Sequence, residues 1–132
     1  MKKIIIDTNF LLIPYQFKVD IFSEIKRICD FKYRLCIIDK TLEEMKKIIA
    51  TQKEKHRRAA VLGVMLLGQK NVYKIRAKKG KSVDESILEI ACKDKKGYVV
   101  ATQDAELKRK LKEKGISLIV LKGKSHLELV AA

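Results

Sequence analysis

The chain has 132 residues, a length that suits one domain built around one hydrophobic core. Hydrophobic residues make up 47% of it, which excludes a disordered tail. The longest apolar stretch, residues 59–67, is far shorter than the roughly 20 apolar residues of a membrane span. No secretion signal follows the N-terminal methionine. These features predict one cytoplasmic domain over residues 1–132, with a short C-terminal tail from about residue 122 and no membrane partner.

The charge of the chain is strongly positive. Thirty Lys and Arg residues against 16 Asp and Glu residues give a net charge of +14 and an isoelectric point near 9.8. Such an excess on a small domain favours polyanionic partners, above all nucleic acid, although a lysine-rich surface can also serve solubility alone. The three cysteines are widely spaced, and no Cys-x-x-Cys pair occurs. A zinc site is therefore not expected, and the thiols should be reduced.

Strands and helices are predicted to alternate along the chain. Short apolar runs indicate strands, and apolar residues at helical spacing indicate the helices between them. This alternation predicts an α/β fold, a three-layer α/β/α sandwich around a mainly parallel sheet of four or five strands. The expected strands are 4–6, 34–38, 72–75, 98–101 and 116–121, and the expected helices are 19–29, 41–52, 53–67, 82–92 and 104–114.

Four acidic residues follow the predicted strands or begin the predicted helices. Asp7 ends the first strand, and Asp104 follows the strand at 98–101. Glu44 and Asp84 are expected in the first turns of two helices. In a parallel sheet, the carboxyl ends of the strands and the starts of the following helices share one edge. The periodicity also places Asp84 and Asp104 on the apolar faces of their helices, where solvated carboxylates are unexpected.

Helix capping is the alternative explanation for these acids. Residues 41–44 and 82–85 both fit the capping box, in which Ser or Thr precedes Glu by three positions. Asp7 and Asp104 could likewise cap short helices. Capping alone does not require four acids to meet at one edge, however. Clustered carboxylates suit Mg²⁺ or Mn²⁺, which prefer oxygen ligands and can promote phosphodiester cleavage.

In order and spacing the chain resembles the PIN domain over nearly its whole length. The matching segments are Ile-Ile-Ile-Asp7-Thr8-Asn9, Glu44-Met45, Val-Asp84-Glu-Ser-Ile-Leu and Ala-Thr102-Gln-Asp104. The resemblance implies a Mg²⁺- or Mn²⁺-dependent endoribonuclease. It makes Asp7, Glu44, Asp84 and Asp104 the catalytic, metal-binding acids, with Glu43 as the alternative to Glu44. It makes Thr8, Asn9 and Thr102 the groups that orient them, and Glu106 an extra acid near the site.

The chain is most similar to single-domain archaeal PIN proteins, which are themselves similar to VapC-type toxins and to PIN endonucleases that process pre-ribosomal RNA. The resemblance implies RNA as substrate, a homodimer, and an antitoxin or pre-ribosomal partner. Basic side chains near the acidic edge are expected to contact the RNA backbone, namely Lys79, Lys81, Lys108 and Arg109.

Two other functions remain open from the residues alone. A haloacid-dehalogenase-type phosphatase also begins with a strand and an aspartate, but it requires a second acid where this chain has Asn9. The other alternative is a non-catalytic RNA-binding or ribosome-assembly module that keeps the PIN fold. The complete set of four acids argues against that module.

Overall fold

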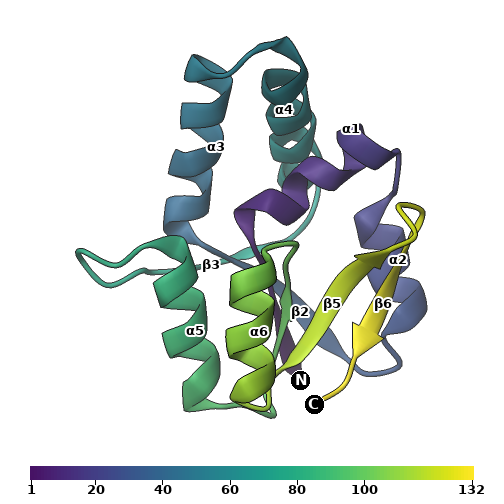
Figure 1. Ribbon diagram of the computed structural model, residues 1–132, viewed down its shortest axis with the longest axis vertical. Coiled ribbons are helices and arrows are strands. Elements are labelled where there is room, and N and C mark those ends of the chain that lie inside the picture. Colours follow the sequence, from purple (N-terminus) through teal and green to yellow (C-terminus); the bar gives the residue numbers. More distant parts are fainter.

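One sheet forms the centre of the computed structural model, which describes residues 1–132 (Figure 1). Its six strands are β1 (Lys2–Ile6), β2 (Tyr33–Ile38), β3 (Tyr73–Ile75), β4 (Tyr98–Ala101), β5 (Ser117–Lys122) and β6 (His126–Val130). They lie in the order β3-β2-β1-β4-β5-β6. The first five are parallel, and β6 runs antiparallel to β5. Because β1 pairs with both β2 and β4, it is an inner strand of the sheet. Its carboxyl end therefore lies within the row of strand carboxyl ends that forms one edge of the sheet.

Helices connect the strands. They are the 3₁₀ helix η1 (Thr8–Leu12), α1 (Ile13–Phe17), α2 (Ile21–Ile28), α3 (Asp39–Thr51), α4 (Glu54–Gly68), α5 (Val83–Lys93) and α6 (Ala105–Glu113). Helices α5 and α6 lie side by side, and α3 and α4 form a hairpin beyond the carboxyl ends of the strands (Figure 1). Gly115, with φ of +74°, ends α6 in the left-handed conformation that glycine accepts without strain.

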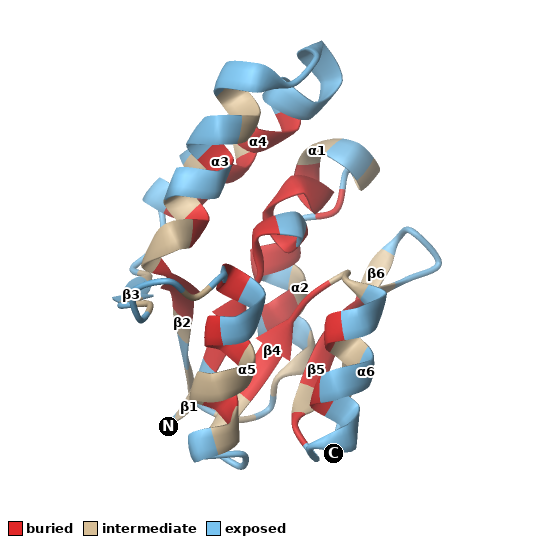
Figure 2. Cartoon of the chain, turned by 60° about the vertical axis from the view of Figure 1, so that its left-hand side comes forward, coloured by how far each residue is buried: buried red, intermediate tan, exposed pale blue.

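The two faces of the sheet bury two separate sets of apolar side chains. Successive residues of a strand point to opposite faces, so Ile4 and Ile6 pack on one side and Ile5 on the other. The first side packs against η1, α1, α2 and α4, including Phe10. The second side packs against α5 and α6, including Ile87. The buried residues lie along the inner surfaces of these layers (Figure 2), which makes the molecule a three-layer α/β/α sandwich.

The α3–α4 hairpin is fixed to the rest of the domain at a glycine. A Cβ atom on Gly63 of α4 would overlap the main-chain carbonyl oxygen of Leu11 in η1 and press on the Met45 side chain of α3. Glycine therefore allows α4 to approach the turn that follows β1 more closely than any other residue would. This contact holds the hairpin beside the carboxyl end of β1.

The predicted fold class is confirmed, with two differences in detail. The sheet has six strands instead of four or five, because residues 126–130, predicted to lie in a tail, form β6 along β5. Helix α3 begins at Asp39, two residues before the predicted start, and the acidic Asp39 lies in the first turn, where the helix dipole favours a negative charge. No helix is both long enough and apolar enough to cross a bilayer.

Candidate active site

Asp7 lies at the centre of the acidic edge and is almost fully buried. It follows the three isoleucines of β1 and is only 3% exposed. One carboxylate oxygen accepts the backbone N–H of Thr8 at 2.8 Å, which begins η1. The other oxygen accepts the Thr102 hydroxyl at 2.7 Å. Burial raises the pKa of Asp7 to about 6, although the Thr102 hydrogen bond opposes the rise.

Thr102 joins Asp7 to Asp104. Its hydroxyl donates to Asp7 and also accepts the backbone N–H of Asp104 at 3.1 Å. Asp104 in turn caps α6, because one of its oxygens accepts the Leu107 N–H at 2.8 Å. The carboxylates after β1 and β4 are therefore positioned by one buried hydroxyl. The predicted neighbourhood of Asp7, Thr102 and Asp104 is present in the fold.

Glu44 reaches the same edge from α3. The Thr8 hydroxyl donates a hydrogen bond to a Glu44 carboxylate oxygen. Because α3 begins at Asp39, Glu44 lies in the second turn of the helix, and the predicted capping box at residues 41–44 is absent. Glu43 precedes Glu44 on the helix, and both are exposed, but of the two only Glu44 hydrogen-bonds to Thr8, the residue after Asp7.

Asp84 lies in the first turn of α5, facing α6, but it is not buried as its periodicity suggested. The helix presents Val83, Ile87 and Ala91 to the sheet, and Asp84 is exposed at the edge of that face. Partial burial still raises the pKa of Asp84, and the negative charges of Asp104 and Glu44 raise it further. The capping box from Ser82 to Glu85 is present, so this part of the capping alternative is correct.

The four acids lie along one edge of the sheet, but their carboxylates do not converge on one metal position. The charge of Asp84, and to a smaller extent that of Glu44, also raises the pKa of Asp7, so these carboxylates interact. No three acidic, histidine or cysteine side chains, however, are close enough together to hold a metal ion as they stand. The hydrogen bonds of Asp7 and Asp104 direct oxygens toward Thr102 and α6, which explains part of this separation.

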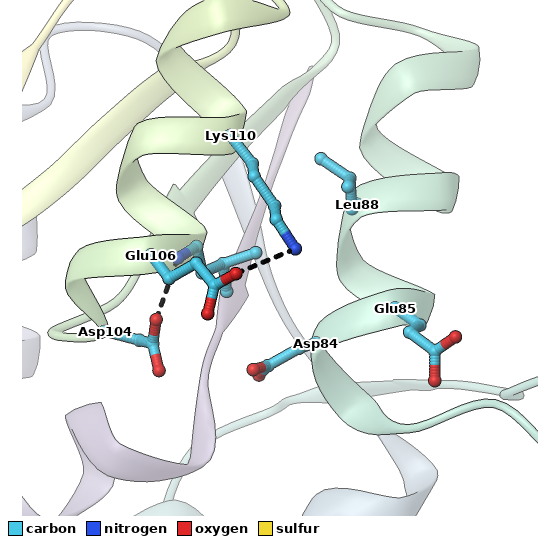
Figure 3. Close-up of a pocket in the computed structure, with 7 residues that line it drawn as sticks. Asp84, Glu85, Leu88, Asp104, Glu106 and Lys110 are labelled. Carbon is cyan, nitrogen blue, oxygen red and sulfur yellow. Dashed lines mark hydrogen bonds and ion pairs between the residues drawn. The ribbon is translucent and has the colours of Figure 1, made fainter.

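A hollow opens between the starts of α5 and α6 (Figure 3). Asp84 and Glu106 lie on its two sides, and the Lys110 ammonium is 3.3 Å from a Glu106 oxygen. The positive charge of Lys110 lowers the pKa of Asp84, against the other influences. Residues of both signs therefore share this opening, which is lined by Asp84, Glu85, Leu88, Asp104, Glu106, Leu107 and Lys110.

Lys110 is the basic residue of α6 that lines this opening. Lys108 and Arg109 were the predicted RNA contacts on α6, but neither lines the hollow. Arg109 instead pairs with Glu113 at 2.8 Å on the exposed side of the helix. Helical spacing accounts for the pairing of Lys110 with Glu106, because Lys110 is four residues after Glu106 on α6.

The remaining predicted residues lie farther along the edge. Asn9 is exposed and lines two hollows beside α3. Lys79 is exposed in the loop before α5. The carbonyl of Lys81 accepts the Lys40 ammonium, and its own ammonium is 4.0 Å from Glu89. These contacts fix the loop that leads to Asp84, and RNA binding by Lys79 and Lys81 stays a prediction.

Comparison with known proteins gives consistent matches. A family model described as a PIN like domain matches residues 4–124. The chain is 33% identical over 129 residues to ribonuclease VapC4 of Methanocaldococcus jannaschii, covering 98% of this chain and 97% of that protein. It is 30% identical over 119 residues to ribonuclease VapC9 of Archaeoglobus fulgidus, covering 89% and 82%. The solved structure of the PIN domain endonuclease Utp24 superposes with a TM-score of 0.77 at 24% identity, covering 98% and 92%.

Proposed function

This chain belongs to the PIN-like domain family, and from that membership we propose that it is a divalent-metal-dependent endoribonuclease. Two relatives of at least 30% identity are named ribonucleases and match it over most of their length, which supports RNA cleavage. The observation that carries the proposal is the joining of acids from separate elements. Thr102 links Asp7 to Asp104, and Thr8, the residue after Asp7, links the end of β1 to Glu44.

The proposed catalytic acids are Asp7, Glu44, Asp84 and Asp104, and their donor chemistry suits Mg²⁺ or Mn²⁺. Burial, and after it the neighbouring negative charges, raise the pKa of Asp7 and of Asp84, and a divalent cation bound at this edge would offset both influences. We therefore assign metal binding to these carboxylates, with small movements of exposed Asp84 and Glu44 completing the set. A bound divalent ion would lower the pKa of a water molecule and offset the charge of the scissile phosphate.

The protein's own residues give the site its order and its charge. Thr102 and the Thr8 N–H hold both oxygens of Asp7, so the buried carboxylate has one orientation. The Thr8 hydroxyl holds Glu44 in the same way. Lys110 brings an ammonium to the opening beside Asp84, where it can contact a phosphate oxygen of the RNA.

The test is RNA cleavage by the wild-type protein and by Asp7→Asn, with Mn²⁺, with Mg²⁺ or with EDTA. We expect cutting only when a divalent ion is present, and loss of cutting in the variant while its circular dichroism spectrum stays native. Equal cleavage by both proteins would remove the acidic edge from the mechanism. Steeply salt-dependent RNA binding without cleavage by either protein would favour the non-catalytic RNA-binding module.

For the cellular role, the two ribonuclease relatives favour a VapC-type toxin with an antitoxin partner. The likeness to Utp24 is below 25% identity and concerns the fold, so it does not favour processing of pre-ribosomal RNA. Induced expression in a host cell should stop growth for the wild type and not for Asp7→Asn. Normal growth with abundant active wild-type enzyme would contradict the toxin role. Homodimerisation stays a prediction.

A further inference from the structure

Three adjoining hollows lead away from the acidic edge along α3. The first begins at Thr8 and Glu44, has a volume of about 300 Å³, and shares Asn9, Ile48 and Gln52 with the second. The second has a volume of about 420 Å³ and shares Gln16 and His56 with a third of about 390 Å³. Together they form what we call the α1–α3 groove, whose lining residues come from η1 and α1 on one side and from the α3–α4 hairpin on the other.

The groove is lined mainly by side chains that form hydrogen bonds without carrying charge. Four of them are amides, each of which offers both donors and acceptors. Three are exposed and one is half-buried, so water can be replaced by a ligand at each of them. They come from η1, α1, the end of α3 and the loop after β4, and they are Asn9, Gln16, Gln52 and Gln103.

The charged residues of the groove favour an anionic ligand. Glu44 is the single carboxylate in the lining, and it lies at the acidic end. Lys47 follows one turn along α3, and Lys18 and Lys55 lie at the far end. A ligand with regularly spaced negative charges would therefore meet a cation at each end of the path. The phosphates of a nucleic acid strand meet this description.

The far end also offers an aromatic ring. Tyr15 lines the third hollow, and the Lys18 ammonium is 4.5 Å from the centre of its ring. Base stacking on an aromatic side chain is a common contact of proteins with unpaired nucleic acid. A base that entered this hollow would contact the Tyr15 ring. Lys18 and Lys55, which line the same hollow, would bind the phosphate next to that base.

We propose that an unpaired RNA strand lies in the α1–α3 groove on one side of the cleaved bond, with its bases read by the amide side chains. The proposal rests on the endoribonuclease function proposed above and adds where the substrate strand lies and which side chains contact its bases. Each hollow is near the lower end of the roughly 300–1,000 Å³ of small-ligand sites, a size suited to single bases. Bases become available to such hollows only when they are unstacked, because double-stranded RNA is recognised mainly by its backbone and shape.

The experiment measures binding by fluorescence anisotropy without metal, using Asp7→Asn as the parent protein so that no RNA is cut. The probes are unpaired oligonucleotides of A, of C and of U, and a blunt RNA duplex of equal length. Gln52→Ala is compared with Gln69→Ala, whose amide is exposed at the end of α4 and lines none of the three hollows. Lys47→Ala is compared with Lys46→Ala, its neighbour on α3 outside the groove.

We expect the unpaired probes to bind more tightly than the duplex. Gln52→Ala should change the ratio of affinities among the three probes by about fivefold or more, as loss of a base contact does. Lys47→Ala should weaken all three probes alike and reduce the slope of log affinity against log salt by about 0.7, the value for one phosphate of a single strand. Neither control should change the ratios or the slope.

Three other results separate the failure of this proposal from failure of the enzyme assignment. If the wild type cuts RNA but Gln52→Ala and Lys47→Ala bind like their controls, the groove assignment is overturned and the endoribonuclease stands. Tighter binding of the duplex would also overturn the assignment. If the wild type neither binds nor cuts any RNA, both proposals are wrong.

Discussion

The Thr102 hydroxyl donates a hydrogen bond of 2.7 Å to the buried carboxylate of Asp7, across 95 residues of sequence. The same hydroxyl accepts the N–H of Asp104. One small side chain thus orders the carboxylates that follow the two central strands β1 and β4. Its substitution should affect both the stability of the domain and the ionisation of Asp7.

Thr102→Val keeps the shape of the side chain and removes both hydrogen bonds. Because the Thr102 bond lowers the pKa of Asp7, its loss should raise that pKa further and shift the rising limb of the cleavage-against-pH profile to higher pH. The unfolding free energy should fall by about 1–3 kcal/mol, since the N–H of Asp104 and an oxygen of Asp7 lose a partner. Thr102→Ser, which keeps the hydroxyl, should retain the wild-type profile. An unshifted profile in the valine variant would contradict this role.

Asp7→Asn should stabilise the metal-free protein at high pH. Between pH 3.8 and about 6 the folded protein retains a proton on Asp7 that the unfolded chain has lost, so stability decreases as the pH rises through that window. The rise in the pKa of Asp7 from 3.8 to about 6 corresponds to a loss of at most about 3 kcal/mol of stability, which the Asn variant does not suffer because it carries no charge there. Urea unfolding in EDTA should show the variant to be about 1–3 kcal/mol more stable at pH 8, with little difference below pH 4. A less stable variant at pH 8 would show that burial does not penalise the Asp7 charge.

Glu44→Gln and Glu43→Gln form a matched pair on α3. Of the two, Glu44 alone hydrogen-bonds to Thr8, and Glu44 alone contributes a charge that raises the pKa of Asp7. We expect Glu44→Gln to lower kcat about a hundredfold or more, as removal of a group acting on the metal does, and Glu43→Gln to remain active. Single-turnover cleavage at saturating Mn²⁺ measures the difference. Equal activities would exclude Glu44 from the site.

Lys110→Met should strengthen divalent-cation binding. The substitution removes a positive charge from the opening that contains Asp84, Asp104 and Glu106, so a metal ion competes with one cation fewer. The Mn²⁺ concentration for half-maximal binding, measured by electron paramagnetic resonance, should fall severalfold. Lys112→Met removes the same charge from an exposed position of α6 outside this opening and serves as the control. The same shift in both variants would mean that net charge alone is responsible.

The strands and the acidic residues could be predicted because their signals are local. The apolar run from Ile4 to Ile6 predicts a buried parallel strand, and Asp7 follows it at the end where such sheets bind ligands. The fold confirms both the strand and its position inside the sheet. The strand β6 was missed although its signal is also local. Residues 126–130 pair antiparallel with β5 across a turn at 123–125, in which Gly123 has a φ of +57°.

The exposure of Asp84 and the place of Lys110 in the opening beside it could not be predicted, for one physical reason. Periodicity identifies the face that a helix turns to the sheet, but it does not identify the helix that lies beside it. The exposure of Asp84 and the approach of Lys110 depend on the packing of α5 next to α6. The α1–α3 groove is likewise formed by segments that join only in the folded chain.

The central position of β1 has a consequence for synthesis of the protein. Asp7 is made 95 residues before its partner Thr102, which directly follows β4, the neighbour of β1 in the sheet. A nascent chain that has not yet released residues 98–104 from the ribosome lacks both Thr102 and Asp104. The growing chain therefore cannot assemble its acidic centre beside the ribosome that makes it until residues 98–104 have emerged.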